Sequence, residues 1–479
     1  MNRRHDMLIG GEWRPASSRA NYDIVDPATE EPIGSAAQAG AEDAAAAIVA
    51  ANAGFEIWRR TGPWERSAVI RRIGALIGER REEIARLITE EIGKPLDQAH
   101  GEVQMTIDLF DWFADEARRI YGQVIEPRGL GSRQHVVFEP VGVVAAFTAW
   151  NFPVLLMSRK IAPALAAGCS IICRPAEEAP GAVLAVGRCC VEAGVPAGVV
   201  NILTGQPTDI TPALLADPSV RKITFTGSVP VGKLLMRQSA DTVKRVTMEL
   251  GGHAPVIVHD DVDIEAVARK SVLAKFRNAG QVCASPTRFY VHESKADRFA
   301  ELFAERARSM RLGHGLETGV DMGPLATRRR RDAVERMVEE ARDSGVKAAA
   351  GAARPAHLKR GYFYEPTVFV DVPEDAAVMR DEPFGPIATI SRFSSFDDVV
   401  RRANGLEYGL SGYVFTGSLA RAHETAAALR VGVVGINTFV ASNAETPFGG
   451  VKQSGFGREG GALGIRDYLD AKFINMELA

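Results

Sequence analysis

The sequence predicts an α/β protein with two doubly wound α/β domains and a small β extension. Three observations lead to this fold class. The chain has 479 residues, too many for one ordinary core. From about residue 136 to 240, short β-rich runs alternate with amphipathic helical segments, as in a parallel sheet with helical crossovers. The same alternation begins again after Gly251 and Gly252.

The individual elements follow in chain order. Residues 41–119 are rich in Ala, Glu and Arg, and their apolar residues recur at helical spacing, so we expect a helical layer there. The next part predicts strands over 141–147, 170–173, 199–203 and 222–225 and helices over 154–167, 180–193, 208–216 and 231–240. The repeat predicts strands over 254–258 and 288–291 and helices over 263–279 and 295–310.

Three further segments complete the expected fold. Residues 346–363, rich in Gly, Ala and Arg, are interpreted as a surface excursion between strands. Residues 133–139 and 472–476 have strand-like sequences with no obvious partner in their own domain. Such strands often pair across subunits, which predicts a homo-oligomer.

Composition excludes several classes of protein. Hydrophobic residues make up 46% and charged residues 24%, a soluble globular balance. The net charge is −3, and the arginines at 328–331 lie in mixed-charge surroundings, so no nucleic acid partner is expected. The five cysteines form no metal-like pairs, which indicates a reducing compartment and no metal site. No signal peptide or membrane-length apolar run is evident, so we expect a cytoplasmic protein with no membrane partner.

Three residues together indicate acyl-transfer chemistry. Cys283 follows Asn278, Gly280 and Gln281, small and polar residues typical of an accessible loop, whereas the other four cysteines suit a core. Glu249 follows a β-like run and precedes two glycines. With Asn151 they supply a thiol nucleophile, a carboxylate base and an amide donor. An ordinary ion-pair role for Glu249 is the alternative.

Two segments are candidates for cofactor binding. Residues 222–232 read as a strand, a turn and a helix, with Gly227, Ser228 and Gly232 placed to receive a phosphate, although a plain strand–helix turn would look the same. Arg174 and Glu177 end another strand at the same predicted edge of the sheet. A carboxylate there can accept ribose hydroxyls and repel a 2′-phosphate, which favours NAD over NADP. Glu177 could equally be an exposed residue at a helix start.

A set of motifs then points to a family. It comprises Thr-Ala-Trp-Asn-Phe-Pro (148–153), Arg-Pro-Ala-Glu (174–177), Phe-Thr-Gly-Ser (225–228), Met-Glu-Leu-Gly-Gly (248–252), Gly-Gln-Val-Cys (280–283), Glu-Pro-Phe-Gly-Pro (382–386) and Pro-Phe-Gly-Gly-Val-Lys-Gln-Ser-Gly (447–455). In this order, from about residue 8 to the C-terminus, the chain resembles the aldehyde dehydrogenase superfamily.

The resemblance implies a catalytic mechanism and a set of cofactor contacts. Cys283 would attack the aldehyde, Asn151 and the Cys283 backbone N–H would hold the oxyanion, Glu249 would activate water, and Lys160 would help to relay protons. The residues expected at the dinucleotide are Thr148, Trp150, Arg174, Glu177, Gly205, Gly227, Ser228, Gly232, Leu250, Glu382 and Phe384. The family usually has Lys at the place of Arg174, and Arg could also grip a phosphate, so NADP remains possible. His253, where Asn is more frequent, is interpreted as structural.

The resemblance also implies the domain organisation. Residues 1–120 and 141–250 would form the dinucleotide-binding domain of an aldehyde dehydrogenase-like fold, and residues 251–449 the catalytic domain. Residues 121–140 and 466–479 would be oligomerisation strands of a dimer or tetramer.

Within the superfamily the chain is most similar to succinate-semialdehyde dehydrogenases. Arg159, Arg277 and Ser442 carry this similarity, with Phe152 and Phe448 as further expected substrate contacts. A guanidinium binds a carboxylate through two parallel hydrogen bonds, so the predicted reaction is oxidation of succinate semialdehyde to succinate. Glutarate semialdehyde, 2-oxoglutarate semialdehyde and carboxylated or polar aromatic aldehydes such as benzaldehyde types satisfy the same logic. In the alternative interpretation, both arginines form internal salt bridges.

Two other functional classes fit these residues less well. A relative that acylates coenzyme A would need no activated water, and Glu249 argues against it. A non-catalytic protein with the same fold would need neither Cys283 nor Asn151. Some members of the group have a second cysteine two positions after the nucleophile, where this chain has Ser285, so we predict no disulfide switch within the loop.

Overall fold

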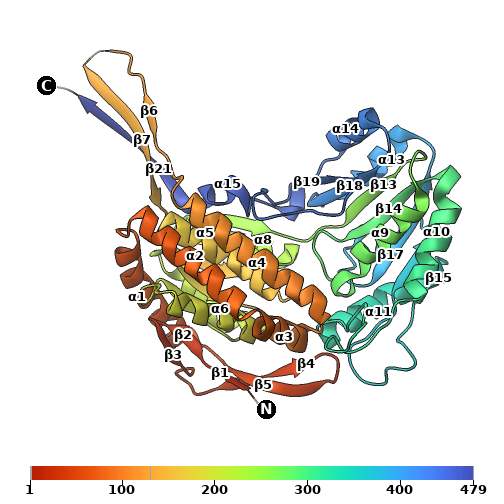
Figure 1. Ribbon diagram of the computed structural model, residues 1–479, viewed down its shortest axis with the longest axis horizontal. Helices are drawn as coiled ribbons and strands as arrows, with labels where there is room; N and C mark the ends of the chain where they lie inside the picture. Colours follow the sequence, from red (N-terminus) through yellow and green to blue (C-terminus); the bar gives the residue numbers. More distant parts are fainter. Residues whose placement is uncertain (1–2, 130, 478–479) are drawn as a thin grey trace.

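The computed structural model describes residues 3–129 and 131–477. Two α/β units lie side by side, and a narrow β arm that carries the C-terminal strand projects from the first (Figure 1). None of the helices in the described residues is both long enough and apolar enough to cross a membrane.

The first unit is built on a mixed sheet in the order β20-β12-β11-β8-β9-β10-β2-β3. Its strands are β2 (Met7–Ile9), β3 (Glu12–Arg14), β8 (Val143–Phe147), β9 (Ser170–Arg174), β10 (Val200–Ile202), β11 (Val220–Thr226), β12 (Arg245–Glu249) and β20 (Gly455–Phe456). The strands from β12 to β10 are parallel, as predicted from their helical crossovers. Since helices cover both faces of the sheet, β8 and β9 are buried along their whole length. Their sequences therefore do not alternate between apolar and polar residues.

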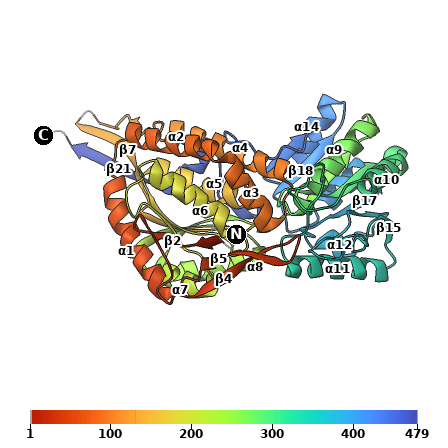
Figure 2. The same cartoon turned by 60° about the horizontal axis from the view of Figure 1, so that its bottom comes forward.

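Helices cover the two faces of this sheet and create two separate cores (Figure 2). They are α1 (Ala41–Trp58), α2 (Pro63–Glu79), α3 (Arg81–Ile92), α4 (Leu96–Glu116), α5 (Pro153–Ala167), α6 (Pro180–Glu192), α7 (Pro207–Ala216) and α8 (Val229–Ser239). On β8, Val144 and Ala146 face the core under α5 and α6, whereas Val143 and Phe147 face the core under α1 and α7.

The prediction of one helical layer over residues 41–119 was therefore wrong in its arrangement, although the whole stretch is helical. α1 packs directly on β8, β9 and β10. α2, α3 and α4 lie outside α5 and α6 on the opposite face. Sequence periodicity identifies an apolar face but does not say which surface that face covers.

The second unit has a sheet in the order β15-β16-β17-β14-β13-β18-β19. Its strands are β13 (Ala254–Val258), β14 (Pro286–His292), β15 (Lys347–Ala350), β16 (Thr367–Val370), β17 (Ile387–Phe393), β18 (Ser411–Phe415) and β19 (Val433–Ile436). Its helices are α9 (Ile264–Phe276), α10 (Glu293–Arg308), α11 (Arg328–Asp343), α12 (Ala377–Arg380), α13 (Phe396–Ala403) and α14 (Leu419–Ala428). The predicted excursion at 346–363 begins with the edge strand β15 and continues as an irregular segment.

The expected single helix over 263–279 ends earlier than predicted. α9 ends at Phe276, and a 3₁₀ turn over Arg277–Gly280 contains Asn278 (φ 50°) and Ala279 (φ 52°) in the left-handed region. The turn changes the direction of the chain ahead of the Cys283 loop. A helix continued to residue 279 would not make this change.

The two expected oligomerisation segments are partners of one another. β21 (Leu469–Glu477) pairs antiparallel with β7 (Ser132–Pro140), and β6 (Gln123–Ile125) completes the arm. The sequence showed no obvious partner for either strand in its own domain; the partner of each is the other segment, which is distant in sequence and adjacent only in the folded chain. A further small sheet has the order β1-β5-β4, from β1 (Arg3–His5), β4 (Asn21–Asp26) and β5 (Glu31–Ala37).

The C-terminal part returns to the first unit. β20 adds to β12, directly beside Glu249. Between the second unit and the arm lie α15 (Gly461–Gly464) and the 3₁₀ turns η3 (Lys452–Ser454) and η4 (Arg466–Tyr468), while η1 (Ala240–Thr242) follows α8. Residues far apart in the sequence therefore meet between the two units.

Candidate active site

Cys283 lies in a loop between the 3₁₀ turn and β14, and its side chain is partly accessible. The other four cysteines are buried in the first core or beside it, as predicted. Gly280 (φ 72°) is required in the preceding turn because a Cβ atom there would lie 2.1 Å from the Gly385 carbonyl oxygen. Burial, followed by the charges of Glu382 and Glu249, raises the pKa of the Cys283 thiol to about 12.

The Asn151 side chain lies against the same loop. Its Nδ2 donates to the Gln281 backbone carbonyl (3.0 Å), and the backbone carbonyl of Asn151 accepts from Asn278 Nδ2 (3.0 Å). Asn151 is 3% exposed and immediately precedes Phe152 and α5. The structure thus brings the predicted amide donor to the loop of the predicted nucleophile.

Glu249 ends β12, and neither of its buried carboxylate oxygens has a hydrogen-bond partner among the described residues. Burial and the nearby Glu459 raise the pKa of Glu249 well above its usual value, while Lys160 and Arg159 act in the opposite direction. Because its pKa is raised, the Glu249 carboxylate is a stronger proton acceptor than an ordinary glutamate, as activation of a water molecule requires.

Lys160 forms a buried ion pair with Glu459. Sequence reasoning missed Glu459, which lies in the glycine-rich run 455–461 just after the last motif. A carboxylate among four glycines was the available signal, since such a sequence does not suit an ordinary solvated helix face. Its backbone also pairs with Phe448 in both directions (2.7 and 2.8 Å).

Apart from Glu382 and Phe384, the predicted cofactor residues lie at or just beyond the carboxyl ends of β8, β9, β10, β11 and β12, which are neighbours in the sheet. The buried Arg174 donates to the Gly205 carbonyl from Nε (3.1 Å) and Nη2 (2.7 Å), and it pairs with Glu177. Open α/β sheets bind ligands at this edge.

Glycines at this edge of the sheet leave room for a ligand to approach the backbone closely. A Cβ atom at Gly227 would lie 2.3 Å from the Phe225 ring, and one at Gly232 would lie 2.6 Å from Leu250. Among the described residues, the buried Thr148 hydroxyl oxygen has no hydrogen-bond partner. Ser228, exposed, immediately precedes α8, and a helix N-terminus favours a bound anion. These features fit a bound dinucleotide.

Glu382 and Phe384 approach this edge from the second unit. The carboxylate of Glu382 accepts the Gly252 N–H (3.2 Å), and burial raises its pKa to about 7. A Cβ atom at Gly251 would lie 2.2 Å from the same carboxylate. The Phe384 ring meets Trp150 edge-to-face, with centroids 5.6 Å apart.

The predicted substrate residues form two groups of contacts. Arg159 is 5% exposed, donates to Ser442 Oγ (2.5 Å) and lies 4.9 Å from the Phe448 ring centre. Arg277 is exposed, and its guanidinium lies 5.5 Å from the Phe152 ring centre. Within residues 3–129 and 131–477, neither guanidinium has a carboxylate partner within 4.0 Å, and Arg159 Nε has no partner.

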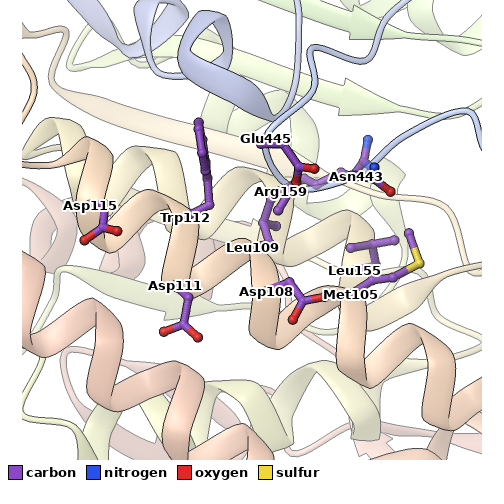
Figure 3. Close-up of a pocket in the computed structure, with 11 residues that line it drawn as sticks. Met105, Asp108, Leu109, Asp111, Trp112, Asp115, Leu155, Arg159, Asn443 and Glu445 are labelled. Atoms are coloured by element: carbon purple, nitrogen blue, oxygen red, sulfur yellow. The ribbon is translucent and has the colours of Figure 1, made fainter.

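A cavity of about 390 Å³ opens beside Arg159, between α4, α5 and the segment 443–445 (Figure 3). Its lining residues are Met105, Asp108, Leu109, Asp111, Trp112, Asp115, Leu155, Arg159, Asn443, Ala444 and Glu445. Part of its acidic charge is already balanced, because Arg71 pairs with Asp111 and Asp115. The described residues contain no cluster of three or more His, Cys, Asp or Glu that could hold a metal ion.

Comparison with known proteins agrees with this geometry. The model of the aldehyde dehydrogenase family matches residues 13–474. The chain belongs to this family. A 3-sulfolactaldehyde dehydrogenase of Pseudomonas putida is 44% identical over 471 residues, 98% of this chain and 96% of the relative. A succinate-semialdehyde dehydrogenase (NADP(+)) of Escherichia coli strain K12 is 42% identical, covering 98% of this chain and 97% of the relative.

A solved aldehyde dehydrogenase of Bacillus cereus in complex with NAD+ has a TM-score of 0.97, at 35% identity, covering 100% of this chain and 97% of that one. The aldehyde dehydrogenase-like fold and the resemblance to succinate-semialdehyde dehydrogenases are thus confirmed. This aldehyde dehydrogenase is an NAD(P)-dependent oxidoreductase that acts on an aldehyde.

Proposed function

We propose that this aldehyde dehydrogenase oxidises an aldehyde with a remote acidic group, with succinate semialdehyde the best candidate. The observation that carries the proposal is the pair of guanidiniums, Arg159 and Arg277, neither of which has a carboxylate partner among the described residues. The alternative of internal salt bridges finds no support in the structure. A charge-assisted hydrogen bond to each arginine would contribute roughly 1.5–3 kcal/mol.

The named substrates of two relatives share such a group. One is a carboxylated aldehyde and the other a sulfonated aldehyde. Either anion fits a guanidinium, so a sulfonated aldehyde is a second candidate beside glutarate semialdehyde, 2-oxoglutarate semialdehyde and carboxylated aromatic aldehydes.

The proposed roles follow from the positions of the side chains. Cys283, as thiolate, attacks the aldehyde carbon, and Asn151 Nδ2 and the Cys283 N–H hold the resulting oxyanion. Glu249 then takes a proton from the water that hydrolyses the thioester, and the Lys160–Glu459 pair relays that proton from Glu249 toward bulk solvent, which leaves Glu249 ionised again. Raised carboxyl pKa values keep the site able to accept and return protons.

The dinucleotide would be held by the glycine-lined edge and by Arg174, Glu177, Trp150, Glu382 and Phe384. When bound, its nicotinamide accepts the hydride that leaves the thiohemiacetal carbon. We propose NAD as the preferred form, because the Glu177 carboxylate lies where a 2′-phosphate would meet its charge, although Arg174 leaves NADP possible.

Initial rates of NADH or NADPH formation test the proposal. Succinate semialdehyde, glutarate semialdehyde, 3-sulfolactaldehyde, butanal and benzaldehyde would each be compared with both cofactors. We expect the anionic aldehydes to lead butanal at least a hundredfold in kcat/KM, which is about 2.7 kcal/mol of transition-state discrimination. Equal rates with butanal would contradict the proposed substrate class.

Substitutions of the two arginines test whether these residues cause the preference for anionic aldehydes. Arg159→Met and Arg277→Met should each remove most of the discrimination and leave butanal oxidation intact. Arg71→Met is the matched control, because Arg71 reaches the same cavity only through Asp111 and Asp115. Cys283→Ala should abolish oxidation of all aldehydes while cofactor binding persists; turnover by that variant would refute the mechanism.

A further inference from the structure

The first two turns of α4 approach the active site with two side chains that the mechanism above does not use. Gln98 and Glu102 lie four residues apart, so both project from one face of the helix. Gln98 contacts the 3₁₀ turn that precedes the Cys283 loop, and Glu102 contacts α5, the helix that follows Asn151. α4 therefore touches both halves of the proposed oxyanion site.

Glu102 caps α5 from outside that helix. Its Oε1 accepts the N–H groups of Val154 (3.0 Å) and Leu155 (3.2 Å). Phe152 at the N-cap offers no side-chain hydrogen bond, and Pro153 has no N–H, so Glu102 satisfies the free donors of the first turn. Because Asn151 immediately precedes this turn, its backbone position is tied to Glu102.

The carboxylate of Glu102 is buried together with its counter-ion. Lys94 forms an ion pair with Glu102, and both residues are 1% exposed. Lys94 Nζ also lies 3.7 Å from the centre of the Phe152 ring. A buried ion pair is weak evidence for stability, since desolvation offsets the attraction, and a role in orientation is the better explanation of this one.

Gln98 holds the other half of the site. Its Oε1 accepts the Asn278 N–H (2.8 Å), and its Nε2 donates to the Asp321 carbonyl (3.2 Å). Asn278 is in the left-handed region, a conformation that persists only where neighbours enforce it. The Asn278 side chain in turn donates to the carbonyls of Asn151 (3.0 Å) and Gln281 (3.2 Å).

We propose that Gln98 and Glu102 are positioning residues that set the distance between the Asn151 amide and the Cys283 loop. Gln98 fixes the strained turn before Cys283, and Glu102 fixes the start of α5 behind Asn151. The inference rests on the proposed roles of Asn151 and Cys283. It does not depend on the tail of the substrate, because the oxyanion is common to all aldehydes.

Gln98→Met and Gln98→Glu form the first test, with succinate semialdehyde and butanal as substrates. Methionine keeps the shape but cannot accept the Asn278 N–H, whereas glutamate still can. We expect the methionine variant to lose at least tenfold in kcat with both aldehydes, with KM within threefold. The glutamate variant should recover most of the loss. Gln104→Met is the control, because Gln104 is on the same helix and its side chain hydrogen-bonds to Asp108, away from the Asn278 turn.

A double-mutant cycle with Asn151→Ala separates positioning from general structural damage. If Gln98 acts through Asn151, the methionine substitution should cost less than threefold in kcat once Asn151 is absent. Losses that multiply, equal losses in Gln98→Met and Gln98→Glu, or a kcat within twofold of the parent would overturn the inference. Full activity of Asn151→Ala would instead overturn the proposed mechanism itself.

Glu102 is tested with its counter-ion removed, so that no unpaired charge is buried. Lys94→Met/Glu102→Gln keeps an acceptor for the first turn of α5 and should stay within threefold of the parent kcat. Lys94→Met/Glu102→Met removes the acceptor and should lose at least tenfold. Equal kcat values in the two double variants would contradict the role of Glu102, and the Gln98 pair decides the matter if either protein fails to fold.

Discussion

At the scale of single residues, the burial of ionisable side chains determines the pKa values at the proposed site. Glu249 and Glu382 both have raised pKa values because protein surrounds them, and their charges in turn raise the pKa of Cys283. The thiol is therefore protonated in the free protein near neutral pH. Catalysis requires its deprotonation when the site is filled, which makes the surrounding charges part of the chemistry.

The first prediction concerns the proposed base. Glu459 raises the pKa of Glu249, and Lys160 lowers it. Glu459→Gln removes the like charge and leaves Lys160 unpaired, and both changes favour ionised Glu249. The acidic limb of kcat should therefore move to lower pH. A profile from pH 5.5 to 9.5 measures this; an unmoved limb, or one that moves upward, would show that Glu249 is not the titrating base.

The second prediction concerns the choice of cofactor. Glu177→Ser removes the carboxylate and frees Arg174 from its ion pair, so the guanidinium can meet a 2′-phosphate. We expect kcat/KM with NADP to rise at least tenfold and that with NAD to fall. Glu178→Ser, at the adjacent position, serves as control. An unchanged ratio of the kcat/KM values with NAD and with NADP would mean that neither Arg174 nor Glu177 contributes to cofactor selectivity at the ribose.

At the scale of elements, the 3₁₀ turn over Arg277–Gly280 couples the two ligand sites. It follows α9, packs against Gly385 and leads to Cys283. Gly385 belongs to the segment that carries Glu382 and Phe384, so a shift of the turn moves both the nucleophile and the proposed nicotinamide contacts. Arg277, at its start, adds a proposed substrate contact to the same element.

The third prediction tests that coupling. Gly280→Ala would place a Cβ atom 2.1 Å from the Gly385 carbonyl oxygen at a φ of 72°. We expect a loss of about 1–3 kcal/mol in unfolding free energy and at least a tenfold loss of kcat. Gly101→Ala in α4, where nothing lies within 4 Å, should leave kcat unchanged and stability equal or slightly higher. Chemical denaturation and steady-state kinetics measure both, and a fully active Gly280→Ala would contradict the coupling.

At the scale of the whole molecule, the residues of the proposed active site come together only where the two units meet. Asn151, Lys160 and Glu249 come from the first sheet and its helices, whereas Cys283 and Glu382 come from segments of the second. The boundaries at 120, 141, 250 and 449 stay predictions, and the return of β20 to β12 shows that the chain crosses between units again near residue 455.

The fourth prediction concerns assembly, which stays a prediction. The β arm exposes Val124 (91%) and Phe473 (57%) on its outer strands, an apolar surface suited to a second copy of the chain. Val124→Lys should lower the mass measured by light scattering after size exclusion. Val49→Lys, at an exposed valine on α1, should not. The same mass for parent and Val124→Lys would exclude the arm surface at Val124 as the interface.

The sequence by itself determined the fold class, the adjacent strands β8, β9, β10 and β11 of the first sheet, the central strands β13 and β14 of the second sheet, and the family. It did so because parallel strands buried on both faces and glycines at ligand-binding turns leave local patterns, as at β8, β9 and Gly227. It also selected Cys283 from five cysteines, since only that one has polar, flexible neighbours.

The tertiary structure alone decided which side chains meet. The end of α9 at Phe276, the pairing of β7 with β21, the Lys160–Glu459 ion pair and the contacts of Gln98 and Glu102 all depend on residues distant in sequence. The absence of carboxylate partners near Arg159 and Arg277 in the described residues is likewise a property of packing. Local patterns report the period and polarity of a segment, whereas burial, charge pairing and pKa depend on the neighbours that folding supplies.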